Sequence, residues 1–264
     1  MSNEKKPPIP LPAATILLLR DGARGLEVFM VKRHHQIDFA SGALVFPGGK
    51  VDPHDRDTAL RKHADGANDL DDLHLSLIAC GIREGFEESG ILLARKSGHR
   101  DYVDAATATA LAPWRPKLTA GETGLAEFLA HEDLRLACDT LVPFAHWVTP
   151  TFMPKRFDTY FYVAAAPKGQ LGRHDGSESV DSLWIDPEEA VADAKRWTII
   201  FPTRMQLAKL ARSKSMAAAI TRAKAEPVVT VEPKVVSRGA EQVLTIPEEA
   251  GYGKVEERLR SLRG

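Results

Sequence analysis

The sequence predicts an α+β protein in which helices pack against a β-sheet, and three stretches carry this prediction. Residues 14–20, ATILLLR, form a nearly continuous apolar run, which is typical of a strand buried on both faces. After a turn at 21–25, residues 26–33 resume as a second strand, LEVFMVKR. From Leu73 onward, apolar residues recur at helical spacing, which indicates an amphipathic helix that packs on the sheet.

Composition is that of a globular protein. The chain has 264 residues, 44% of them hydrophobic, which is enough for a substantial core in one large domain or one domain with decoration. The net charge of −1 gives no support to a nucleic-acid-binding face, which usually carries a clustered basic surplus. No apolar run approaches the length of a membrane span. Residues 1–11 are charged and rich in proline, so we expect a disordered lead there and not a signal peptide. We therefore expect a cytoplasmic protein with no nucleic-acid or membrane partner.

Cysteine and histidine spacing does not suggest a metal site. Cys80 and Cys138 lie far apart, and we expect them to be small buried side chains of an intracellular protein and not a disulfide. Residues 51–70 are polar with little periodicity, which predicts an inserted loop. His54 and His63 in this loop lack a partner at ligand spacing, so we interpret them as solvated.

A third short strand at 43–46 leads into Pro47, Gly48 and Gly49. Glycines there let a backbone carbonyl approach an ion that a side chain would keep away. A diglycine alone is more often a simple turn, so its weight comes from the helix that follows.

That helix begins after a capping residue, Asp71 or Asp72, and Gly90 ends it, because a glycine just past the last turn can adopt the left-handed conformation. The positions expected to face the sheet are apolar: Leu73, Leu77, Ile78, Ile82 and Phe86. On the other side of the helix, Arg83 is expected to orient one of the neighbouring glutamates through a bidentate contact.

Three carboxylates share that other side. Glu84, Glu87 and Glu88 stand at i, i+3 and i+4, so they project from one face of the helix. Three like charges repel, and the arrangement makes sense mainly when a divalent cation lies between them and holds substrate phosphates in its remaining positions. The alternative is a solvated acidic helix face.

These residues resemble the Nudix box. Gly48 and Gly49 match its first half, and Arg83, Glu84, Glu87, Glu88, Gly90 and Ile91 match its second half. The sequence departs from the family pattern in two ways. Asp55 stands where the first glutamate is usual, and the loop before Arg83 is about twenty residues longer than the usual one. The resemblance implies a Nudix fold, a mixed β-sheet sandwiched between helices (α/β/α), over residues 12–210.

The resemblance also implies a reaction. Long inserts in the box, together with FASGALVFPGGKVD at 39–52 and SLWIDPEEA at 182–190, resemble the coenzyme A diphosphatase branch of the family. This implies hydrolysis of a nucleoside diphosphate derivative, most favourably coenzyme A or acyl-coenzyme A, to adenosine 3′,5′-bisphosphate and (acyl-)4′-phosphopantetheine. Mg²⁺ or Mn²⁺ is the implied cofactor, held by Glu84, Glu87, Glu88 and the Gly48 carbonyl.

Further site residues follow from the same comparison. The base is implied to be either Glu84 or an acid from the loop GRHDGSES, where Glu178 is favoured over Asp175 and Asp181. Arg33 is in register with a substrate-binding signature of a second coenzyme A branch.

The rest of the chain predicts further elements. Residues 99–135 are expected to form a helical insertion with a break at 112–116, and 141–149 and 157–165 to return as strands. Between these strands, Lys155 and Arg156 either grip a substrate phosphate or are plain surface charges.

The region beyond residue 186 is expected to be mostly helical at first. Residues 187–195 and 202–224 predict two helices, and the second continues into a C-terminal region, 211–264. That region contains a β-hairpin with Arg238 and Gly239 at its turn, and edge packing or a homodimer contact is its expected role.

Two other functions remain open. One is the same reaction on ADP-ribose or a dinucleotide such as NADH. The other is a non-catalytic Nudix module that senses nucleotides or binds RNA, since a fold does not fix a function. Retention of all three glutamates disfavours the second.

Overall fold

The computed structural model describes residues 7–33, 42–174, 176, 179–193 and 196–258. Its largest element is a mixed sheet of eight strands, with the order β10-β2-β1-β9-β8-β11, in which β3 pairs with β2 and β4 pairs with β1. The strands are β1 (Leu11–Gly22), β2 (Gly25–Arg33), β3 (Leu44–Val45), β4 (Gly48–Lys50), β8 (Val142–Val148), β9 (Phe157–Ala165), β10 (Ser179–Ile185) and β11 (Thr230–Val231). The β1/β9 and β8/β11 pairs are parallel and the other pairs are antiparallel, so the predicted mixed sheet is confirmed.

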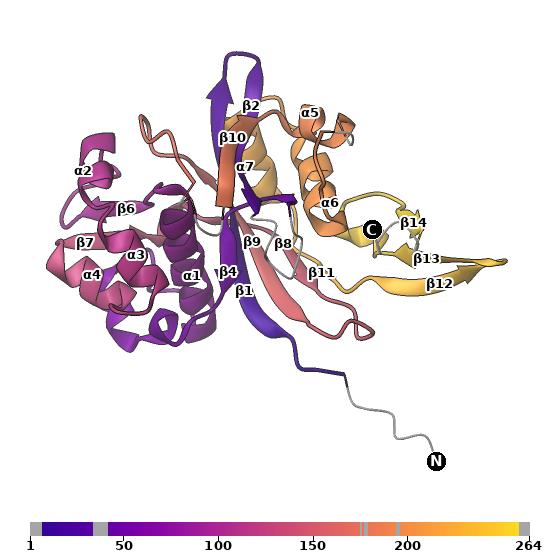
Figure 1. The fold of residues 1–264 in the computed structure, drawn as a ribbon, viewed down its shortest axis with the longest axis horizontal. Coiled ribbons are helices and arrows are strands. Elements are labelled where there is room, and N and C mark those ends of the chain that lie inside the picture. The colour runs from indigo at the N-terminus through magenta and orange to yellow at the C-terminus, as the bar shows by residue number, and fades with distance from the viewer. Residues whose placement is uncertain (1–6, 34–41, 175, 177–178, 194–195, 259–264) are drawn as a thin grey trace.

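Helices cover both faces of this sheet, as Figure 1 shows. On one face lies α1 (Asp72–Ser89), packed on the even-numbered residues of β1, Ala14, Ile16 and Leu18. On the other face lie α6 (Phe201–Leu210) and α7 (Met216–Ala225), packed on Leu17 and Leu19. This alternation is what a strand buried on both faces requires, because successive side chains point to opposite sides. The fold is therefore the predicted sandwich of helices around a sheet.

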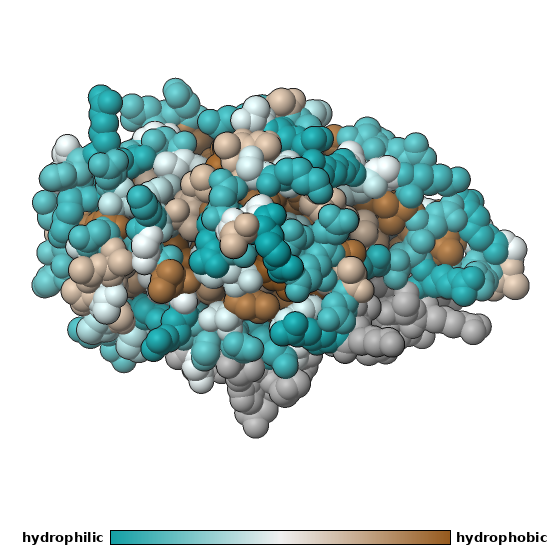
Figure 2. Space-filling view, turned by 90° about the horizontal axis from the view of Figure 1, so that it is seen from above, coloured by the Kyte–Doolittle hydropathy of each residue, from teal (hydrophilic) through white to brown (hydrophobic). Residues whose placement is uncertain are grey.

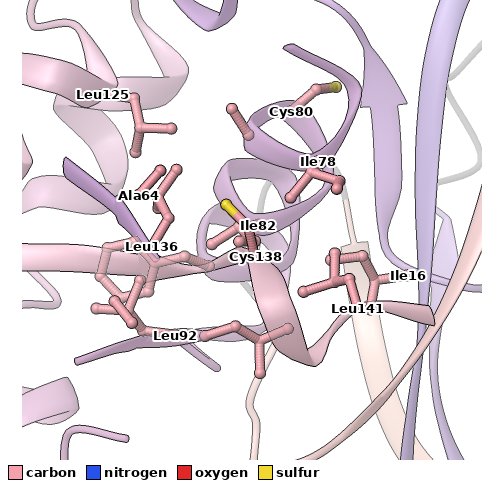
Figure 3. Packing of buried hydrophobic residues seen from close by; sticks show 14 of the residues in the cluster. Ile16, Ala64, Ile78, Cys80, Ile82, Leu92, Leu125, Leu136, Cys138 and Leu141 are labelled. Carbon is pink, nitrogen blue, oxygen red and sulfur yellow. The ribbon is translucent and has the colours of Figure 1, made fainter. Parts of the chain in front are cut away.

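The α1 face carries an additional layer. Three short helices, α2 (Ala105–Ala110), α3 (Trp114–Thr119) and α4 (Leu125–His131), lie beside a small sheet of β5 (Ala64–Asp65), β7 (Leu134–Ala137) and β6 (Ala94–Lys96). Figure 3 shows the core between this layer and α1, where Ile82 lies beside Leu136. Cys80 and Cys138 lie in the same core as buried free thiols, as predicted.

Two predictions about the insertions need correction. Residues 51–70 are not a plain loop: they form the 3₁₀ helices η1 (Pro53–Arg56) and η2 (Thr58–His63) and strand β5. Asp52 and Asp57 start these helices by accepting hydrogen bonds from the backbone N–H groups of His54 and Ala59. The expected break at 112–116 is also helical in part, because α3 begins there.

The C-terminal region differs from its prediction in two ways. The helix expected at 202–224 is two helices, because the Ser215 hydroxyl accepts a hydrogen bond from the Ala218 N–H and starts α7 anew. The hairpin is present as β12 (Lys234–Arg238) and β13 (Glu241–Thr245), with Gly239 and Ala240 at the turn, and β14 (Glu256–Arg258) extends it to a three-stranded sheet. A 3₁₀ helix, η4 (Glu248–Ala250), lies between β13 and β14.

Two remaining elements complete the description: the 3₁₀ helix η3 (Cys138–Thr140) and helix α5 (Pro187–Ala192), which Asp186 caps. Leu73, predicted to face the sheet, is 46% exposed because it lies in the first turn of α1, beyond the sheet contact. Figure 2 shows a mainly hydrophilic surface with small hydrophobic patches. None of the helices in the described ranges is long and apolar enough to cross a membrane.

Candidate active site

The glycines of β4 occupy positions where a side chain would meet close neighbours. A Cβ on Gly48 would lie 2.4 Å from the backbone oxygen of Ala14, and a Cβ on Gly49 would lie 2.3 Å from Oε1 of Glu84. The Pro47 carbonyl accepts a hydrogen bond from the Ile16 N–H of β1, and the Val51 N–H donates one to the Pro12 carbonyl. Because successive residues of a strand turn their backbone groups to opposite sides, the N–H and C=O of Gly48 point away from β1. The Gly48 N–H donates to Oε2 of Glu88 at 3.1 Å.

Helix α1 carries the three predicted glutamates to this strand. Its N-terminus is fixed by Asp71, whose carboxylate accepts from the His74 N–H, and its C-terminus by Gly90, which has φ 72° and donates its N–H to the Phe86 carbonyl. Glu87 and Glu88 are buried, and the side chain of Glu84 is 15% exposed. The carboxylates therefore do not form a solvated helix face.

Arg83 holds the acidic groups together. Its Nε and Nη2 donate to the two carboxylate oxygens of Asp55, both at 2.9 Å, and its Nη1 lies 3.0 Å from Glu84 and 3.1 Å from Glu87. Burial alone would lower the pKa of Arg83, but the hydrogen bonds that Arg83 donates to Asp55 and the charge of Glu84 outweigh it and raise this pKa. The bidentate partner is thus Asp55, and the contacts of Arg83 with Glu84 and Glu87 are single.

Burial makes ionisation of these glutamates costly. It raises the pKa of Glu84 to about 7 and is opposed by the charge of Arg83, while Glu87 adds a like charge. Burial also raises the pKa of Glu87. Carboxylates that resist ionisation and lie at a cavity are frequent at functional sites.

The donor chemistry of this site fits a hard divalent cation. Glu84, Glu87 and Glu88 supply carboxylate oxygens beside the outward-facing backbone of Gly48, and such oxygens are the ligands that Mg²⁺ and similar ions take. Within the described ranges, no three acidic, histidine or cysteine side chains converge on one point, because Nη1 of Arg83 lies between Glu84 and Glu87. These ligands would therefore have to turn toward the ion when it binds.

The helical insertion reaches into this site, which the sequence did not reveal. The Thr119 hydroxyl donates to Oε2 of Glu87 at 3.1 Å. Arg115 donates from Nε and Nη2 to the backbone oxygen of Glu87, at 3.0 and 2.7 Å, and from Nη2 to the backbone oxygen of Arg173 at 3.3 Å. Glu87 is thus fixed by a segment that follows it by about thirty residues, and no local pattern signals such a contact.

A large cavity of about 1260 Å³ opens onto the glutamates. Its lining includes all three of them together with Arg33, predicted to bind substrate, and Lys155. Three further cations, Lys50, Arg56 and Arg204, line the same cavity and were not predicted. The cavity thus combines an acidic centre with several positive side chains, which suits an anionic ligand that binds through a metal ion.

Arg156 has a different role from the one predicted for it. Its side chain is buried and donates to the Thr149 carbonyl at 2.8 Å, to the Pro8 carbonyl at 3.1 Å and to the carboxylate of Glu232 at 2.8 Å. These contacts tie the N-terminal segment and the chain after β11 to the β8/β9 turn. Arg156 does not line the cavity, so we do not retain it as a phosphate ligand.

The predicted loop acid cannot be placed. Glu178 and its competitor Asp175 lie outside the described residues, whereas Asp181 lies in β10, opposite Lys32. The described part of this loop is joined to α1, since the Arg173 N–H donates to the Ser89 carbonyl at 2.7 Å.

Comparison with known proteins identifies the family. The model of the NUDT19 Nudix domain matches residues 60–212, more than half of the chain and the part that contains the three glutamates. The chain belongs to the NUDT19 Nudix domain family.

Relatives of this NUDT19-type Nudix protein are distant. It is 24% identical to the acyl-coenzyme A diphosphatase NUDT19 of Xenopus laevis over 215 residues, which are 67% of this chain and 57% of that protein. It is 28% identical to the putative nudix hydrolase 7 of Caenorhabditis elegans over 204 residues, 76% of this chain and 61% of that protein. The chain therefore spans less than two thirds of the length of either relative.

A solved structure supports the fold assignment. The NUDIX hydrolase from Alicyclobacillus acidocaldarius superposes with a TM-score of 0.64 at 26% sequence identity, and the match covers 81% of this chain and 96% of that one. Nudix hydrolases generally use divalent metal ions, in agreement with the donor set at α1.

Proposed function

We propose that this protein hydrolyses the pyrophosphate bond of a nucleoside diphosphate derivative, with coenzyme A or its acyl esters as the favoured substrates. The observation that carries the proposal is the group of three α1 glutamates at the wall of a cavity that also contains, besides the ion-paired Arg83 and Arg204, four cationic side chains, Arg33, Lys50, Arg56 and Lys155. The names of two relatives, acyl-coenzyme A diphosphatases of Xenopus laevis and Homo sapiens, support the choice of substrate.

The glutamates and the Gly48 carbonyl would hold Mg²⁺ or Mn²⁺. When bound, such ions neutralise the phosphate oxygens and lower the pKa of a coordinated water. The protein's own part is to keep the carboxylates in place. Asp55 holds Arg83, Arg83 spans Glu84 and Glu87, and Thr119 holds the second oxygen of Glu87.

The base has two candidates. Glu84 is one, because burial raises the pKa of its carboxylate to about 7, so that it can accept a proton near neutral pH. Glu178 is the other, from the loop that follows Arg173. Either group would take the proton of the attacking water on a carboxylate oxygen.

Substrate phosphates would be bound by the cations of the cavity. Arg33 and Lys155 are the predicted ligands, and Lys50 and Arg56 join them on the cavity wall. Coenzyme A carries a third phosphate besides the diphosphate, so it offers these four cations more negative charge than ADP-ribose does. ADP-ribose and NADH stay as alternative substrates of the same reaction.

Product analysis tests the proposal. We would incubate the protein and Mg²⁺ or Mn²⁺ with coenzyme A, acyl-coenzyme A, ADP-ribose and NADH, and identify the products by mass. Adenosine 3′,5′-bisphosphate formed only from the coenzyme A compounds is the expected result. AMP formed from ADP-ribose would support the proposed reaction but reject coenzyme A as the favoured substrate. No product from any compound would reject the proposal that the protein is a hydrolase.

A variant assigns the activity to the site. Glu87→Gln removes a ligand charge and keeps the side-chain shape. Because losing a partner of a metal ligand already costs roughly 10–100-fold, we expect a loss of at least about 100-fold in turnover at saturating Mg²⁺. Glu127→Gln, at an exposed residue of α4, is the matched control. Full turnover by the Glu87 variant would reject the role of the glutamates.

A further inference from the structure

The floor of the cavity is one face of the main sheet. Strand registers place Lys50 of β4 opposite Ala13 of β1, Ala13 beside Thr159 of β9, and Thr159 opposite Trp147 of β8, and all four residues line the cavity. Neighbouring strands lie about 4.8 Å apart, so Trp147 is roughly 14 Å from β4, three strands away. The cavity therefore continues well beyond the glutamates.

The far part of the cavity, toward β8 and the C-terminal sheet, contains several large apolar side chains. Its lining there includes aromatic and aliphatic side chains: Trp147, Phe152, Phe161, Phe201 and Leu244. Most of them are buried, but Phe152, in the turn between β8 and β9, is 53% exposed. A large exposed apolar side chain at a cavity is a feature of ligand sites.

The C-terminal sheet closes this end. Pro233, Leu244 and Glu257 line the cavity, and all three lie beyond residue 212, the end of the family match. Glu257 forms an ion pair of 2.7 Å with Arg204 of α6, so the positive charge of Arg204 is matched at this end. This end of the cavity thus combines apolar side chains with the Arg204–Glu257 ion pair and with Lys155 of the β8/β9 turn.

Tyr252 anchors the C-terminal sheet to the cavity floor. Its hydroxyl accepts from Nε1 of Trp147 at 3.0 Å and donates to Oε1 of Gln206 at 2.8 Å. The rings of Trp147 and Tyr252 also meet edge to face, with centroids 5.6 Å apart. The Trp147 indole is therefore held in place by the segment that links β13 to β14.

We propose that Leu244 of β13, Trp147 of β8 and Phe152 of the β8/β9 turn form an apolar subsite for the acyl group of the substrate. The inference rests on the proposed function, and it adds the part of the chain that selects acylated over free coenzyme A. The occupant must be apolar and joined to the diphosphate by an arm that spans from β4 to β8. An acyl group on the long arm of a coenzyme A ester meets both conditions, whereas the ribose of ADP-ribose is polar and directly attached.

Two variants probe the subsite. Leu244→Trp fills the cavity from the C-terminal sheet, and Phe152→Ser removes the exposed apolar side chain on the opposite rim. Controls are Val235→Trp, on the neighbouring strand β12, and Leu171→Ser, at a residue that is 72% exposed; neither lines the cavity. Thermal melting checks that each variant is folded. If Leu244→Trp does not fold, because Leu244 is buried, the result for Phe152→Ser alone tests the subsite.

The readout is the ratio of kcat/KM for palmitoyl-coenzyme A to that for free coenzyme A. Burial of each CH₂ is favourable, so wild type is expected to prefer the palmitoyl ester, and both subsite variants to lower the ratio at least about tenfold. Octanoyl-coenzyme A should give an intermediate loss, and the controls should keep the wild-type ratio.

The outcomes separate this inference from the proposed function. Equal kcat/KM for free and palmitoyl-coenzyme A in the wild type, or an unchanged ratio in folded subsite variants, would overturn the apolar subsite and leave the hydrolase standing. No hydrolysis of any coenzyme A compound would overturn both.

Discussion

The cost of ionising Glu84 gives a prediction that can be checked without substrate. Burial raises the pKa of Glu84 from 4.5 to about 7. A pKa difference of one corresponds to ~1.4 kcal/mol, so holding Glu84 ionised in the metal-free fold costs about 3 kcal/mol. Glu84→Gln keeps the shape and removes the charge. We therefore expect the variant to be more stable than wild type by up to about 3 kcal/mol.

The pH dependence of this difference follows from the sign of the shift. Because the folded-state pKa lies above the unfolded value, the protonated form stabilises the fold, and this stability is complete below pH 4.5 and lost as the pH rises through about 7. Wild type and variant should thus have equal free energies of unfolding near pH 4, and the free energy of unfolding of the variant should exceed that of wild type most at pH 8.

Urea unfolding in EDTA, followed by the fluorescence of the four tryptophans, measures the difference at each pH. Glu127→Gln, at an exposed position, should show no such trend. Mg²⁺ should then stabilise wild type more than the Glu84 variant, since a ligand that binds the folded state raises its stability. A Glu84 variant that is less stable than wild type at pH 8 would refute the reasoning.

Three further predictions concern residues around the site. Asp55→Asn breaks the buried pair with Arg83 and should destabilise the fold by about 3–5 kcal/mol in urea unfolding, whereas the exposed Asp57→Asn should cost far less. Thr119→Val should weaken Mn²⁺ binding roughly 10–100-fold by calorimetry, and Thr119→Ser should restore it. The Thr107 N–H, which donates to the Asp104 carboxylate, lowers the pKa of Asp104. The ionised cap therefore stabilises the fold at pH values above the usual pKa of an aspartate, and this stability is lost as the pH falls. The difference in melting temperature between wild type and Asp104→Ala should thus vanish in acid.

The sheet and the main helix were predictable because their signals are local. The run 14–20 alternates between two cores, and Asp71 and Gly90 mark the ends of α1 through capping, which depends only on neighbouring backbone groups. The same local pattern placed Glu84, Glu87 and Glu88 on one face.

Contacts between distant segments were not predictable in this way. Thr119 reaches Glu87 and Asp55 reaches Arg83 only after the insertions have folded onto α1, and neither residue stands in a periodic pattern that points to its partner. The division of the helix expected at 202–224 depends on the Ser215 hydroxyl, which favours a cap over helix continuation. Arg156 looked like a surface charge or a phosphate ligand because the carboxylate that binds it, Glu232, lies 76 residues away.

The glycines of β4 explain how glutamates on one side of the sheet reach a cavity on the other side. Helix α1 packs on the face of β1 that carries Ala14 and Ile16, whereas the cavity floor is the opposite face, with Ala13 and Thr15. The Glu84 carboxylate lies where a Cβ of Gly49 would stand, so it reaches the cavity past a strand that has no side chain in the way. A side chain at position 48 would collide with the backbone of β1, whereas one at position 49 would meet the Glu84 carboxylate. Gly49→Ala should therefore push the Glu84 carboxylate aside while the helix and the sheet stay intact, and Gly48→Ala should disturb the β1/β4 pairing itself.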